Sequence, residues 1–201
     1  MTMSDRFGAL AVTAPDIVAA WEGIETERVI SVRREVRRRT APGSAGRIVE
    51  QLEAVAAALV AVVETLPEHA FALAGGEEDW TVAQAIGHDA DARAGLALAA
   101  ALAARGRFPE EAPAVVPGIP GPPDASRELL VHRLQLSQRT IERCARSIAG
   151  HETDRCPLVH PLVGRLRCGE WLLFVGVHDL MHLEQVETIE RALALAGSLG
   201  R

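Results

Sequence analysis

Apolar side chains recur every three or four residues along four long segments, the spacing that places them on one face of an α-helix. In the first segment they run from Ile48 to Val63, and Pro67 ends it. The second starts with TVAQ at Thr81, the pattern of a capping box, and stops at Gly106. The predicted helices span residues 44–66, 81–105, 124–149 and 169–196. Few residues outside these helices show the pattern of a β-strand. The four helices therefore predict an all-α fold, a four-helix bundle.

The remaining segments are less regular. Residues 107–124 contain six prolines and residues 151–169 contain two prolines and two glycines, so both are expected to be non-helical connections, long enough for a crossover. The first 40 residues are expected to form an N-terminal extension, followed by a bundle domain of residues 41–201. Within the extension a helix from Pro15 is expected, but the β-branched run RVISV leaves a strand open.

Composition narrows the functional classes. The 201 residues suit one domain, the net charge is −6, and all 21 basic residues are arginine. An acidic chain argues against nucleic-acid binding, and the run Arg33–Arg39 is interpreted as a solvated segment. Three cysteines without CxxC spacing indicate a reduced, cytoplasmic compartment. No signal-peptide pattern is present, and the apolar runs are too short to cross a membrane.

Two histidines lie one turn apart on the fourth predicted helix. His178 and His182 share a stripe with Trp171 and Phe174, and therefore point into the bundle. The polar positions of this helix are expected on the opposite side: Glu184, Glu187 and Arg191. Burying an unpaired imidazole costs ~1–3 kcal/mol. The pair is either two ordinary buried histidines or part of a metal site, which requires a third ligand.

His88 is the best candidate for that third ligand, because it lies in the second turn of the second predicted helix beside small residues such as Ala85 and Ala92. His132 is a weaker candidate with polar neighbours. The histidines in connections are expected to face solvent: His69, His151 and His160. The two aspartates that follow His88, Asp89 and Asp91, are given no role, and Asp89 is expected to point away.

Two known metal motifs do not fit. HDLMH resembles the zincin motif HExxH, but Asp179 is one methylene shorter than the glutamate that must reach a metal-bound water. The sheet that accompanies such a helix is also not predicted. A carboxylate-bridged di-iron site needs inward glutamates near the histidines, and none is predicted on the fourth helix.

Two longer stretches, WTVAQAIGHDADA and HPLVGRLRCGEWLLFVGVHDLMHLEQV, together with the four-helix outline, resemble the DinB/YfiT-like superfamily of metal-dependent enzymes. The resemblance covers roughly residues 44–196. The matching positions are Trp80, Thr81, His88, His160, Pro161, Gly164, Leu166, Glu170, Trp171, His178, His182 and Gln185. The chain departs from the family pattern at Gly87, where a larger apolar residue is usual, and a looser helical turn is expected there.

The resemblance implies a homodimer and a divalent metal, zinc or nickel, held by His88, His178 and His182. Members with known chemistry include thiol-dependent S-transferases and a mycothiol-dependent isomerase. A metal-bound water or low-molecular-weight thiol would act on a small-molecule substrate. Gln185, one turn beyond His182, would orient that ligand or support a ligating side chain, or would only pack against a neighbouring helix. The alternative is a non-catalytic binding or dimerisation module with a structural or vestigial metal site.

Overall fold

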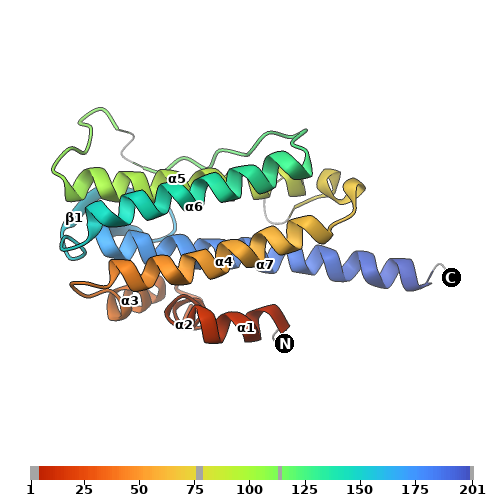
Figure 1. The fold of residues 1–201 in the computed structure, drawn as a ribbon, viewed down its shortest axis with the longest axis horizontal. Coiled ribbons are helices and arrows are strands. Elements are labelled where there is room, and N and C mark those ends of the chain that lie inside the picture. Colours follow the sequence, from red (N-terminus) through yellow and green to blue (C-terminus); the bar gives the residue numbers. More distant parts are fainter. Residues whose placement is uncertain (1–4, 76–78, 113–114, 200–201) are drawn as a thin grey trace.

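Four long helices form the body of the molecule, and three shorter ones precede them (Figure 1). The computed structural model describes residues 5–75, 79–112 and 115–199. Residues 1–4 of the N-terminal extension and 113–114 of the proline-rich connection lie outside this description. The elements are α1 (Asp5–Thr13), α2 (Pro15–Glu22), α3 (Arg28–Arg39), α4 (Ala45–Thr65), the 3₁₀ helix η1 (Glu68–Ala72), α5 (Val82–Ala104), α6 (Arg127–Ile148), β1 (Arg155–His160), β2 (Gly164–Arg167) and α7 (Cys168–Leu199).

The bundle helices run up, down, down and up, which confirms the predicted four-helix architecture. α4 and α7 run in the same direction, and Thr65 at the end of α4 hydrogen-bonds to Glu190 late in α7 at 2.9 Å. α5 and α6 are also parallel, because residues 115–126 run back along the bundle before α6 begins (Figure 1). α4 and α5 each pack against both α6 and α7. Within the described residues, no helix is both long and apolar enough to span a membrane.

The helix boundaries follow the signals in the sequence. The Thr81 hydroxyl accepts a hydrogen bond from the Gln84 N–H at 3.2 Å, and the Gln84 amide oxygen accepts from the Thr81 N–H at 3.0 Å, so the predicted capping box is present. α6 begins at Arg127, three residues later than expected. The reason is that Ser126 supplies the cap, accepting from the backbone N–H of the helix's first turn.

The connection between α6 and α7 contains an antiparallel hairpin that the sequence did not predict. Its turn reaches Gly164, whose φ of +67° favours glycine. Only two apolar side chains of β1, Cys156 and Leu158, alternate inward, which is too short a pattern to indicate a strand. The hairpin carries β1 to the side of α5, where it becomes important for the functional site.

The N-terminal helices pack against α4 and α7. The predicted helix from Pro15 is confirmed as α2. The alternative of a strand at RVISV is wrong, because this run lies in α3, a helix that buries Val32 and Val36 on one face. Ile17 of α2 fills the space above Gly176 of α7, where a Cβ would lie 2.5 Å from the Ile17 Cδ1 atom. A residue without a side chain is therefore needed at 176 for this close approach.

One polar position of α7 was wrongly assigned to the solvent side. Glu187 is only 3% exposed, and Arg6 of α1 lies against it. The Arg6 guanidinium of α1 pairs with Glu187 at 3.5 Å and with Glu190 at 2.6 Å. The hydrophobic core is continuous across the predicted boundary near residue 40, and the division into an extension and a bundle domain stays a prediction.

Glu35 of α3 is a buried carboxylate surrounded by arginines. It is 3% exposed and accepts hydrogen bonds from Arg34, Arg38 and Arg39 at 2.8, 3.1 and 2.6 Å. Burial alone would raise the pKa of Glu35, but the guanidinium groups outweigh it and lower the pKa from 4.5 to about 2. A folded-state pKa below the unfolded value means that ionised Glu35 stabilises the fold above pH 4.5, and that this contribution is lost toward pH 2.

We therefore expect the wild-type protein to lose about 2–3 kcal/mol of unfolding free energy between pH 5 and pH 2 through this one group. Glu35→Gln should lose correspondingly less over the same range, measured by urea denaturation at a series of pH values. Glu25→Gln is the matched control, because exposed Glu25 pairs with the same Arg34. Parallel pH profiles for wild type and Glu35→Gln would contradict the expectation.

Candidate metal centre

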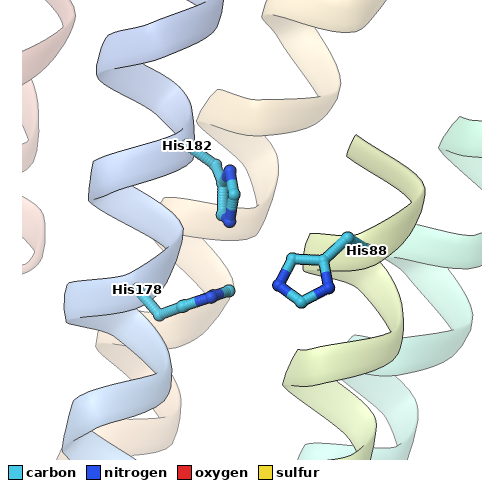
Figure 2. A group of neighbouring side chains, drawn as sticks. All are labelled: His88, His178 and His182. Carbon is cyan, nitrogen blue, oxygen red and sulfur yellow. The ribbon is translucent and has the colours of Figure 1, made fainter. Parts of the chain in front are cut away.

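Three histidines from α5 and α7 face one another (Figure 2). His88 lies in the second turn of α5, and His178 and His182 lie one turn apart on α7. The ring centroids are 4.6–5.5 Å apart, and one nitrogen of each ring lies within 4.8 Å of the other two. All three side chains are half-buried, so the cluster is not sealed from solvent. The structure thus brings together the three histidines that the sequence predicted as ligands.

Each ring is held through the same nitrogen, Nδ1, by an oxygen acceptor. The pairs are His88 with the Ile119 backbone oxygen (2.8 Å), His178 with Asp89 Oδ1 (3.1 Å) and His182 with Gln185 Oε1 (2.9 Å). Because these oxygens accept, Nδ1 is the protonated nitrogen in every ring, and Nε2 keeps a lone pair. This is how metal-ligating histidines are usually oriented in proteins.

Two of the rings favour the neutral state that a metal requires. Burial lowers the pKa of His182 to about 4, with a further contribution from the charge of His178. Burial likewise lowers the pKa of His88. Among the described residues none hydrogen-bonds to the three Nε2 atoms. Free imidazole nitrogens of this kind suit zinc, nickel, copper or iron. The residues present therefore fit a divalent transition metal.

Gln185 was predicted to orient a bound ligand, to support a ligating side chain or only to pack. The structure places its amide oxygen against His182 Nδ1, nearly one turn away on the same helix. It therefore contacts a candidate ligand directly.

The prediction that Asp89 points away from the site is wrong. Its carboxylate is fully buried and accepts from His178. Consecutive residues of an α-helix lie ~100° apart around its axis. Because α7 packs closely on α5, both His88 and Asp89 can face α7. Asp91, by contrast, is exposed and pairs with Arg133 of α6.

Behind Asp89 lies a buried polar network. Arg93 and Asp179 are fully buried and form an ion pair, and Arg93 also donates to Ser137 Oγ at 3.0 Å and Gln138 Oε1 at 2.8 Å. The Asp89 and Asp179 carboxyl groups meet through oxygens that have no other partner among the described residues. Burial raises the pKa of Asp179 well above its ordinary value, whereas the pKa of Asp89 is lowered, chiefly by its hydrogen bond with His178 against the opposing effect of burial. Arg93 is the buried cation beside both carboxyl groups and balances their negative charge.

The buried network includes Asp179, the second residue of HDLMH. Its carboxylate pairs with Arg93 and Asp89 rather than with the three Nε2 atoms, in agreement with the rejection of a zincin site. Asp89, His178 and Asp179 also offer ligand atoms within 4.8 Å of one another. The guanidinium of Arg93 already supplies a cation there.

The acceptor for His88 comes from the proline-rich connection. Residues 115–122, called the strap below, are fixed at both ends by backbone hydrogen bonds. The Val116 N–H donates to the Val159 carbonyl of β1 at 2.8 Å, and the Gly121 N–H donates to the Gln84 carbonyl of α5 at 2.9 Å. The strap therefore links the hairpin to the start of α5 and passes beside His88.

The departure from the family pattern predicted a looser helical turn at Gly87, but α5 continues through this position. Gly87 instead provides the contact for the strap. A Cβ at Gly87 would lie 3.0 Å from the Gly121 Cα atom, and a Cβ at Gly121 would lie 2.6 Å from the Gly87 Cα atom. Two facing glycines allow the two backbones to approach this closely. The approach brings the Ile119 carbonyl within 2.8 Å of His88 Nδ1.

Aromatic rings line the surroundings of the cluster. The Trp80 ring lies 4.9 Å from His88, and the Phe174 ring lies 6.2 Å from His178. His160, predicted to face solvent, is instead half-buried with its ring 5.2 Å from Phe174. That prediction was wrong because the hairpin that carries His160 was not foreseen. The other three histidines outside the cluster are exposed: His69, His132 and His151.

Sequence reasoning missed Arg93 and the strap carbonyl for different reasons. Arg93 continues the buried stripe of α5 that includes Ile86, Ala90 and Ala97, so a charged residue on an apolar face was a usable signal. The Ile119 carbonyl belongs to the backbone, and no side-chain pattern marks it.

Fold and cluster define a helical-bundle protein with three histidines between two antiparallel helices. The sequence profile of the DinB superfamily matches residues 51–186, more than half of the chain, and the chain belongs to this superfamily. The match contains all three clustered histidines, whereas the N-terminal helices lie outside it. Neither the curated proteins nor the solved structures gave a significant match.

Proposed function

We propose that the chain is a metal-dependent enzyme in which His88, His178 and His182 hold one divalent ion, zinc or nickel. One observation carries the proposal: every Nδ1 atom is engaged by an acceptor, so three neighbouring Nε2 lone pairs are available. Membership of the DinB superfamily supports it further.

A bound dication would lower the pKa of a coordinated water or thiol, which is the chemistry of a hydrolase or a thiol-dependent S-transferase. The chain's own residues prepare the site. Asp89 keeps the His178 proton on Nδ1 and strengthens Nε2 as a donor. Gln185 holds His182 through a neutral amide. Half-buried Trp80 beside His88 offers an apolar surface to a small organic substrate.

Metal analysis tests the proposal. Untagged wild-type protein, loaded with zinc or nickel and desalted, should retain about one equivalent of metal per chain. His178→Ala should retain far less, because two imidazoles bind a dication much more weakly than three. His132→Ala, an exposed histidine on α6, is the control and should match wild type. Equal metal content in wild type and His178→Ala would refute the assignment.

A cobalt-substituted sample separates an enzyme from the alternative, a binding or dimerisation module with a structural ion. If a coordination position is open, 2-mercaptoethanol should change the visible spectrum. If the ion only stabilises the bundle, the spectrum should stay constant while a chelator lowers the melting temperature. A low-molecular-weight thiol cosubstrate, a small-molecule substrate, the homodimer and a cytoplasmic location are proposals that rest on the family resemblance.

A further inference from the structure

His160 is a fourth imidazole close to the three-histidine cluster. It ends β1, and its ring lies 5.2 Å from Phe174, whose ring lies 6.2 Å from His178. Its nitrogens are not among the ligand atoms that gather within 4.8 Å. Its link to the cluster is the ring of Phe174, which lies near both His160 and His178. Burial lowers the pKa of His160 to about 4. His160 thus adjoins the cluster without belonging to it.

The hydrogen bonding of His160 is opposite to that of the three clustered histidines. The backbone N–H of Leu162 donates to His160 Nδ1 at 3.1 Å. A nitrogen that accepts carries a lone pair, so the proton of the neutral ring is on Nε2. No acceptor among the described residues hydrogen-bonds to Nε2, and this nitrogen is not among the fully buried atoms without a partner. His160 therefore presents an accessible, unused N–H donor.

The charge balance indicates what that donor would meet. Three neutral imidazoles leave the charge of a bound dication uncompensated. An anion on the open side would compensate the ion. Carboxylate oxygens accept hydrogen bonds from N–H groups well, whereas thiolate sulfur accepts weakly.

We propose that the His160 Nε2–H donates a hydrogen bond to an oxygen of a small carboxylate bound at the open side of the three-histidine cluster. His160 is then a ligand-binding residue that favours carboxylate-bearing substrates. This inference rests on the metal site proposed above. It assigns the second reactant of that site a chemical class, whether the first is water or a thiol.

Acetate binding to the cobalt-substituted protein tests the inference. The visible spectrum, followed during an acetate titration at pH 7, should give a dissociation constant about tenfold higher for His160→Ala than for wild type, as expected for the loss of one charge-assisted hydrogen bond. The dissociation constant for 2-mercaptoethanol should stay the same. His160→Gln keeps an N–H donor and should recover part of the acetate affinity. Circular dichroism shows whether each variant is folded.

A second measurement does not depend on the variants. In ¹⁵N-histidine-labelled wild-type protein, NMR should show His160 protonated at Nε2 and the three clustered histidines protonated at Nδ1. Equal acetate affinity in wild type and both His160 variants, or a His160 ring protonated at Nδ1, would overturn the inference while leaving the metal site intact. A wild-type protein that takes up no cobalt would overturn both.

Discussion

Replacing Arg93 by alanine should lower the free energy of unfolding by about 3–5 kcal/mol. Arg93 is fully buried, and its guanidinium is the cation that balances the buried negative charge at Asp89 and Asp179. Alanine would leave that charge uncompensated, remove the donors to Ser137 and Gln138, and create a cavity. Urea denaturation followed by circular dichroism measures the loss.

Arg133→Ala is the matched control for this prediction. Arg133 also pairs with an aspartate across the α5–α6 interface, but its partner, Asp91, is 60% exposed. An exposed pair contributes about 0–1 kcal/mol, so this variant should unfold at nearly the wild-type urea concentration. Similar losses for Arg93→Ala and Arg133→Ala would show that the buried network does not carry the charge balance described here.

Replacing Asp89 by asparagine should weaken metal binding about 10–100-fold while leaving the protein folded. Asparagine has nearly the same shape, and its amide oxygen can still accept from His178. Its amide N–H can donate to the neighbouring Asp179 carboxyl group. The negative charge behind the His178 ring is lost, so Nε2 becomes a weaker donor to a dication. Competition against a zinc-sensitive dye measures the dissociation constant.

Asp91→Asn removes a carboxylate two residues away that pairs with Arg133 and hydrogen-bonds to none of the three histidines. Its zinc affinity should equal that of wild type, which separates the hydrogen bond to His178 from a general change in surface charge. Zinc bound as tightly by Asp89→Asn as by wild type would mean that the Asp89 carboxylate does not support the site.

The parts of the fold that could be predicted are the long helices, in which the apolar spacing recurs over many turns. α4, α5 and α7 begin and end within a few residues of their expected bounds, because each has many turns of apolar spacing. The hairpin offered only two inward side chains, Cys156 and Leu158, and was missed. Glu187 was misplaced because periodicity on a single helix carries no information about α1, which lies far away in sequence and contacts Glu187 through Arg6.

The candidate site also has residues that the sequence could predict and residues that it could not. His178 and His182 could be paired from their spacing alone, and His88 was added from its small neighbours and from the family resemblance. The groups that orient these rings were harder to foresee. Gln185 lies three residues from His182, within reach of local reasoning. Asp89 required knowledge of how closely α7 approaches α5, which depends on packing across the whole bundle.

The strap has a consequence for anyone who wishes to transplant this cluster into another helical bundle. The group that orients His88 is the backbone oxygen of residue 119, so an exchange of the exposed Ile119 side chain should leave the ring undisturbed. The strict requirement falls instead on Gly87 and Gly121, neither of which has a side chain to offer a ligand. A design that copies only the three histidines would leave the His88 ring free to rotate. The smallest unit that can be moved includes the glycine contact and the segment that crosses it.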